Sequence, residues 1–137
     1  MSVLNKMSTT LYSTLTGGTA LTALLSGTAA VYNTKAPDTA TYPYVVFSLQ
    51  AGQPLNINPS DIREEVYWIR AHSQTSMGNA GSIDAQISNL IDRKTLSISG
   101  YTNYFTVREQ EVAIVEQAPD GVDVFTAGAM YRISIDS

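Results

Sequence analysis

The stretch Tyr42-Pro-Tyr-Val-Val-Phe-Ser-Leu-Gln50 is the part of the sequence from which the fold can be worked out. Pro43 cannot donate a ladder hydrogen bond, so it suits the first position of a strand. The residues that follow it, Tyr44–Phe47, are β-branched or aromatic, and apolar side chains occupy both odd and even positions. Such a run is typical of a strand that is covered on both faces. The stretch therefore predicts a central strand of a sheet.

Two helical segments are expected before this strand. The first is amphipathic, because apolar side chains recur at helical spacing at Leu4, Met7, Leu11 and Leu15. Gly17-Gly18 ends it, and Thr19 can cap a second, short helix that Gly27 stops. A short strand around Ala30–Tyr32 and a polar connection then lead to the central strand.

A projecting hairpin is expected after Gln50. Residues 51–60 contain two prolines, a glycine and two asparagines, which predicts a loop. Leu55 and Ile57 are apolar, so the loop either folds back over the core or is buried by another chain, and the residues leave both possibilities open. Residues 62–74 return as a strand that contains Trp68. Two long strands joined by such a loop predict an antiparallel hairpin whose tip projects from the body.

The C-terminal half predicts one helix and a second hairpin. After a flexible lead-in at Met77–Ser82, Ser82 is expected to cap a helix whose apolar stripe is Ile83, Ile87, Leu90 and Ile91. Residues 103–117 are expected to form a strand. Its apolar side chains switch from odd-numbered to even-numbered positions within Arg108–Glu111, which predicts a bulge or break there. Ala118–Gly121 is a turn sequence, and the strict alternation over residues 125–135 predicts the last strand. The sum is an α+β fold, with helices packed beside a mostly antiparallel sheet of about four to five strands.

Length and composition limit the class of protein. At 137 residues, the chain is expected to form a single domain, residues 1–137. The absence of cysteine excludes disulfides and cysteine-ligated metals, and a net charge of −4 argues against sequence-specific nucleic-acid binding. Only 15% of the residues are charged, against about 25% in ordinary domains, which hints that other subunits cover part of the surface. No apolar run reaches the roughly 20 residues of a membrane span, and the N-terminus lacks the pattern of a signal peptide, so no membrane association is expected.

The residues predict no active site. His72 has no second ligand at metal spacing, and the adjacent Glu64 and Glu65 point to opposite faces of a strand. Asp84 and Asp92 are expected on a solvated helix face. No Gly-x-Ser-x-Gly elbow or phosphate-binding glycine pattern occurs. We therefore expect no enzymatic activity, no cofactor and no metal, and we expect the aromatic side chains to pack across strands.

Several short motifs, taken in order, resemble the phage tail-completion family, which comprises tail-terminator or tail-to-head-joining proteins of long-tailed phages. The resemblance rests on Leu11-Tyr-Ser-Thr-Leu15, Ala20–Gly27, Val31-Tyr32, Ala36-Pro37 and above all Tyr42-Pro-Tyr-Val-Val-Phe47. The helix at residues 83–91 and the closing strand at residues 127–135 also match the family's plan. The chain departs from that plan in the long loop at residues 51–61 and in the parity break at Arg108–Glu111.

The resemblance implies a structural protein of the virion. Members of the family look like small α+β subunits that close into a ring, usually a hexamer, at the head-proximal end of the tail tube. The ring stops tube polymerisation and presents a surface to head-completion or connector proteins, while DNA passes through its channel without specific binding. The implied partners are further copies of the chain, the tail tube protein and the head-completion protein. The implied location is the neck of the virion, after assembly in the host cytoplasm.

The contact with neighbouring subunits or the tail tube is expected to comprise Leu55, Asn56, Ile57, Asn58 and Trp68. A head-to-tail ring needs two different patches on each subunit, and the light surface charge and the apolar loop suit that need. Six copies of net charge −4 would sum to about −24, and an acidic channel wall would repel rather than retain passing DNA.

Two other classes of function stay open at this point. One is a different neck, connector or minor tail adaptor protein of the same virion, which the position of the protein in the particle would distinguish. The other is a monomeric ligand-binding module that uses the aromatic hairpin, which a mass measurement in solution would distinguish. A hydrolase would need a clustered acid pair that only the fold could create.

Overall fold

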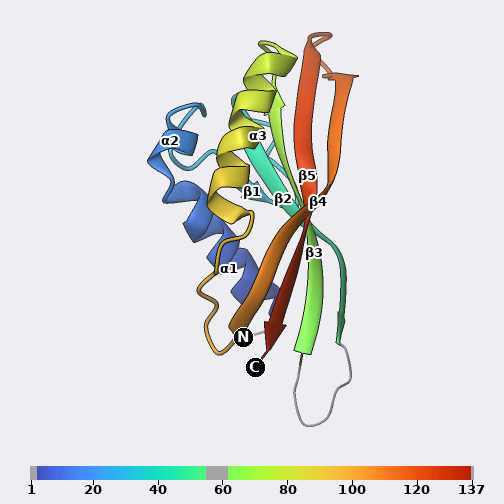
Figure 1. Ribbon diagram of the computed structural model, residues 1–137. Coiled ribbons are helices and arrows are strands. Elements are labelled where there is room, and N and C mark those ends of the chain that lie inside the picture. Colours follow the sequence, from blue (N-terminus) through green and yellow to red (C-terminus); the bar gives the residue numbers. More distant parts are fainter. Residues whose placement is uncertain (1–2, 55–61, 137) are drawn as a thin grey trace.

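The computed structural model describes residues 3–54 and 62–136 and shows one sheet with its helices on one side (Figure 1). The elements in chain order are α1 (Val3–Thr16), α2 (Thr19–Thr22), β1 (Val31–Asn33), β2 (Tyr44–Pro54), β3 (Ile62–Ser73), α3 (Met77–Ile91), β4 (Thr102–Gln117) and β5 (Asp123–Asp136). The strand order is β1-β2-β3-β5-β4, in which β1 pairs parallel with β2 and every other pair is antiparallel. This confirms the expected α+β fold class and the mostly antiparallel sheet. No helix within the described ranges has the length and apolarity to cross a membrane.

The core lies between the helices and one face of the sheet. The stripe on α1 buries Met7, Leu11 and Leu15 completely, while Leu4 in the first turn stays 48% exposed. The expected cap of α2 is wrong. Gly18 is the N-cap, with an extended backbone and no side-chain hydrogen bond, because Thr19 already has helical geometry.

Helix α3 begins earlier than the sequence suggested. Residues 77–82, expected as a flexible lead-in, form its first turns, and the N-cap is Ser76 rather than Ser82. The Ser76 hydroxyl accepts a hydrogen bond from the Asn79 backbone N–H at 3.0 Å. Glycines at 78 and 81 therefore do not prevent helix formation here, because the cap and the packed stripe stabilise the helix. That stripe is confirmed, with Ile83, Ile87 and Ile91 fully buried and Leu90 packed against the core.

The hairpin of β2 and β3 is confirmed, but β2 is longer than expected. Residues 51–54, expected in the loop, continue the ladder as far as Pro54 opposite Arg63, with a register shift between Leu49 and Ala51. The bulge and the edge position let a Gly- and Pro-containing segment stay in the sheet. Only Val45–Phe47 of β2 has a strand on both sides, and β3 is the middle strand of the sheet.

The second hairpin has two irregularities, of which one was expected. The register of β4 against β5 shifts between Arg108 and Glu111, which confirms the predicted bulge, and also between Asn103 and Phe105. At the second site the buried Asn103 side chain replaces ladder bonds, since it donates to the Ser134 carbonyl and accepts from the Leu96 N–H. The turn at Ala118–Gly121 is confirmed, and Gly121 has a φ of 84°, which favours glycine.

Candidate assembly interface

One face of the sheet has no helix against it (Figure 1). The odd-numbered residues of β3 from Glu65 to Ser73 are buried on the helix side, whereas the even-numbered residues from Ile62 to His72 are half-buried and point to the other face. We call this other face the uncovered face. Trp68, Arg70 and His72 occupy it on β3, and Met130 lies opposite Trp68 on β5. A sheet face of this kind, with no described element over it, is available to another chain.

Trp68 and Arg70 form a stacked pair at the centre of the uncovered face. The guanidinium carbon of Arg70 lies 4.0 Å from the centroid of the Trp68 ring, a cation–π geometry. The Nε1 of Trp68 and the Nε of Arg70 are buried without a hydrogen-bond partner among the described residues. Burial lowers the pKa of the Arg70 guanidinium below its usual value. The pair thus presents a cationic and aromatic surface on the middle strand of the sheet.

His72 continues the same face towards the end of β3. Its Nδ1 lies 2.9 Å from the Thr126 hydroxyl oxygen, and its ring centroid lies 5.2 Å from that of Tyr44. Burial, with a smaller contribution from Arg70, lowers the pKa of His72 to about 4. The imidazole is therefore neutral at neutral pH and packs across strands with tyrosine.

Charged side chains of both signs link β3, β5 and β4 on the uncovered face. Arg132 on β5 reaches Glu64 on β3 at 3.2 Å and Glu109 on β4 at 2.9 Å. Glu65 lies on the opposite face, as expected for adjacent strand residues, and it pairs with Arg63 at 3.0 Å. These acids are engaged with arginines, so they do not form a converging carboxylate pair of the kind a hydrolase would need.

The expected solvated position of Asp84 and Asp92 is wrong. The Asp84 carboxylate accepts hydrogen bonds from both terminal nitrogens of Arg108, at 3.0 and 2.6 Å. The Asp92 carboxylate accepts a hydrogen bond from the Arg108 backbone N–H at 2.9 Å. The physical reason is the register of β4, which places Arg108 opposite Tyr131 on the helix side of the sheet. The spacing of residues along the helix did not indicate the pairing of Asp84 with Arg108, because the two residues lie 24 positions apart in the sequence.

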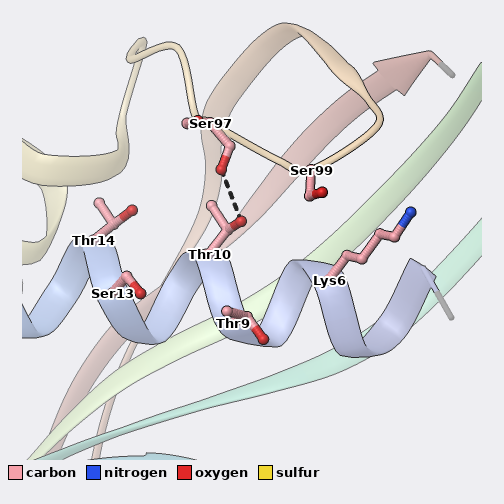
Figure 2. Close-up of a pocket in the computed structure, with 7 residues that line it drawn as sticks. All are labelled: Lys6, Thr9, Thr10, Ser13, Thr14, Ser97 and Ser99. Carbon is pink, nitrogen blue, oxygen red and sulfur yellow. Dashed lines mark hydrogen bonds between the residues drawn. The ribbon is translucent and has the colours of Figure 1, made fainter. Parts of the chain in front are cut away.

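A groove of about 670 Å³ runs between α1 and the segment at residues 97–99 (Figure 2). Its lining consists mainly of hydroxyl side chains with a single lysine: Lys6, Thr9, Thr10, Ser13, Thr14, Ser97 and Ser99. The Thr10 hydroxyl donates to the Ser97 carbonyl at 2.9 Å, as the dashed line in Figure 2 shows. The lining offers no general base, and no group of three or more His, Asp or Glu in the described ranges is arranged to hold a metal ion.

Of the residues expected to make the subunit or tail-tube contact, the structure places one. Trp68 lies at the centre of β3 on the uncovered face. Leu55, Asn56, Ile57 and Asn58 lie outside the described residues. Two features of this surface were not predicted from the sequence: Arg70 and the long exposed edge of β4. The apolar run Val112–Val115, which lies between charged residues, could have indicated the exposed edge.

The described residues therefore present one uncovered sheet face, a stacked Trp68–Arg70 pair on it and acids that are engaged with arginines. Comparison with protein families is specific: the family described as tail completion protein gp17 matches residues 9–132. The chain therefore belongs to this tail-completion family, as its resemblance implied, and it is a structural protein of the phage tail and virion.

One solved structure illustrates how far the fold is shared. A chain titled as part of the virion of a native gene transfer agent particle has a TM-score of 0.78 with this chain at 16% sequence identity. The match covers 99% of this chain and 98% of that chain, so the whole fold is common to both. Comparison with curated proteins gave no match.

Proposed function

We propose that this chain is a tail terminator that closes into a ring, a hexamer, at the head-proximal end of the tail tube. The observation that carries the proposal, beside family membership, is the shape of the sheet. The helices cover one face only, and the two sides of the sheet end in different strands, β1 with β2 on one side and β4 on the other. A head-to-tail ring needs two such different surfaces on each copy.

In this role the ring stops tube polymerisation and joins the tail to the head. Its partners are the tail tube protein below and a head-completion or connector protein above, and its place is the neck of the virion, reached by assembly in the host cytoplasm. DNA passes through the channel without specific binding. The chain makes and breaks no bonds, so it acts by shape and by occupying a polymerisation end.

The contact with a neighbouring subunit or the tail tube includes Leu55, Asn56, Ile57 and Asn58 together with Trp68. The double variant Leu55→Asp with Ile57→Asp tests this contact. We expect it to abolish assembly while the circular dichroism spectrum and thermal unfolding stay close to those of the parent. The matched control places two aspartates at Leu4 and Tyr12, which are 48% and 42% exposed on α1. Normal assembly of the loop variant would contradict this contact.

Electron microscopy of particles made without this chain tests the function as a whole. A missing terminator should give tails of uncontrolled length that carry no heads, since nothing caps the growing tube. Tails of normal length beside separate heads would indicate instead a connector on the head side. A protein that is absent from the particle and stays monomeric would indicate the ligand-binding module.

A further inference from the structure

The outer half of β4 is an unprotected edge strand. From Glu111 to Gln117 every residue except Val112 is exposed, and the segment contains no proline. Ile114 and Val115 are 37% and 55% exposed, in the uncharged run Val112–Val115, three of whose four residues are β-branched. Natural proteins protect such edges because an exposed apolar edge strand pairs with another chain. No strand lies beyond this edge in the described part of the chain.

The backbone groups of this edge can be followed from the covered half of β4. There the Thr106 carbonyl accepts from the Arg93 N–H at 2.8 Å and the Arg108 N–H donates to Asp92, so both residues direct their backbone groups away from β5. Arg108 lies opposite Tyr131, and beyond the bulge Glu111 lies opposite Ala129. Tyr131 and Ala129 are two residues apart on β5, so Glu111 directs its backbone N–H and C=O groups outward as Arg108 does. The alternate residues that follow it do the same: Ala113, Val115 and Gln117.

The opposite side of the sheet offers a second free edge. Strand β1 covers only the start of β2, where the Val45 N–H donates to the Ala30 carbonyl and the Phe47 carbonyl accepts from the Thr34 N–H. Residues 49–54 are exposed and uncharged, and no strand of the described chain lies outside them. After the bulge at Leu49/Ala51, Gly52 again directs its backbone groups outward.

We propose that the β4 edge at Glu111–Gln117 of one copy pairs antiparallel with the β2 edge at Leu49–Pro54 of the next copy. The pairing rests on the proposed ring and specifies the contact that builds it. Three antiparallel pairs separate β2 from β4, so the two strands run in opposite directions, and a head-to-tail repeat joins them as an antiparallel ladder. The free halves lie at opposite ends of the sheet (Figure 1), so neighbouring copies are shifted along the strands, as in a closed barrel.

The outward-facing backbone groups and the apolar side chains together select the register of this ladder. Placing Gly52 opposite Ala113 brings together residues that both direct their backbone groups outward. It also places Ala51 opposite Ile114 on the uncovered face, and Leu49 beside Val115 on the helix side. Apolar side chains then meet on both faces of the new pair, which is the arrangement that stabilises antiparallel strands.

Disulfide formation between copies tests the ladder, because the chain has no cysteine of its own. Ala51→Cys and Ile114→Cys copies are mixed, assembled onto tails in the host, and oxidised. We expect a covalent dimer from this mixture and none from Ala51→Cys mixed with Ala113→Cys. Alternate strand residues point to opposite faces, so only a strand pairing produces this contrast.

A substitution of the backbone donor gives an independent readout. Ala113→Pro removes one outward N–H without affecting the ladder with β5, and proline is tolerated on an edge. We expect it to reduce assembly onto tails at least about tenfold, as loss of a central ladder bond and its neighbours would. The control Ala113→Val keeps the N–H and should assemble normally. Thermal unfolding of both variants shows that the monomer is folded.

The outcomes separate this proposal from the proposed function. A ring on tails without the cross-link between positions 51 and 114, or normal assembly of Ala113→Pro, overturns the edge pairing and leaves the terminator function standing. A covalent dimer from Ile114→Cys copies alone shows pairing of β4 with β4 and also overturns it. Tails that carry no ring of this chain overturn both proposals together.

Discussion

Arg108 connects β4 to α3 through a single side chain. Its guanidinium donates to both Asp84 oxygens and to the Tyr131 hydroxyl, the last at 2.8 Å. The hydrogen bonds to Asp84 raise the pKa of Arg108 above its usual range, so the Arg108 guanidinium stays protonated at all ordinary pH values. Both side chains are about six-sevenths buried, at 14% and 15% exposure. Such a pair matters for stability mainly because removing one partner leaves the other charge unpaired.

Asp84→Ala should therefore lower the free energy of unfolding by about 3 kcal/mol, at the lower end of the cost of breaking a buried pair. The matched control is Glu111→Ala, which removes the other carboxylate on Arg108. Glu111 is 74% exposed, so the control should cost less than about 0.5 kcal/mol. Urea denaturation at neutral pH measures both. Equal losses for the two variants would show that burial of the pair is unimportant.

His72 should make the protein sensitive to mild acid. Its pKa is about 4 in the folded chain and close to its ordinary value of 6.5 when unfolded. The unfolded chain therefore binds a proton that the folded chain does not, and stability is lost as the pH falls from about 6.5 towards 4. His72→Gln should lose less stability than the parent between pH 7 and pH 5, measured by urea denaturation. Acidic residues titrate in both proteins, so parallel losses would contradict this role of His72.

At the scale of an element, α3 shows how a cap sets a helix boundary. Ser76→Ala removes the side chain that accepts the Asn79 N–H, and it should cost about 1 kcal/mol of stability. Ser82 has the same chemistry but lies inside the helix, where its hydroxyl donates to the Gly78 carbonyl. Ser82→Ala is therefore the control, with an expected cost below about 0.5 kcal/mol. Chemical denaturation of the pair measures the difference, and a larger loss for Ser82→Ala would place the cap where the sequence alone suggested.

Strands β3 and β5 approach closely at Gly128. A Cβ there would lie 2.4 Å from the Ile69 carbonyl oxygen and 2.6 Å from the Arg70 Cα, and the backbone cannot move aside easily. Gly128→Ala should lower the free energy of unfolding by about 2 kcal/mol through overpacking. Gly81→Ala is the control, because nothing lies within 4 Å of its Cβ position, and it should stabilise α3 by about 0.5–1 kcal/mol. A harmless Gly128→Ala would show that the strands can separate locally.

At the scale of the whole molecule, the free edges carry little charge. Leu49–Pro54 has none, and the exposed half of β4 has only Glu111 and Glu116. An assembly held by such edges depends on backbone hydrogen bonds and apolar contacts, which salt screens weakly. Raising sodium chloride from about 0.05 M to about 0.5 M should leave the amount of tail-bound protein within about threefold. Sedimentation of tails with quantitative blotting measures this, and dissociation in high salt would indicate contacts between charged surfaces instead.

Several features were predictable because they depend on local periodicity. The parity change within Arg108–Glu111 indicated the bulge, and the alternation over residues 125–135 indicated β5, since a strand has a period of two. The stripe on α3 was found, but its start was not. Gly78 and Gly81 suggested a loop, and the capping interaction of Ser76 with Asn79 became visible only in three dimensions.

The sequence by itself determined the α+β class, the order of the elements and membership in the tail-completion family, because these follow from patterns within short windows and from their order along the chain. Only the tertiary structure decided which carboxylates are paired, which face of the sheet is uncovered and which strand edges are free. Asp84 and Arg108 meet across 24 residues, and the two free edges depend on where β1 stops and where residues 92–93 cover β4. Contacts between distant segments leave no periodic pattern in the sequence. Such contacts determine which surfaces of the chain stay exposed for the proposed assembly.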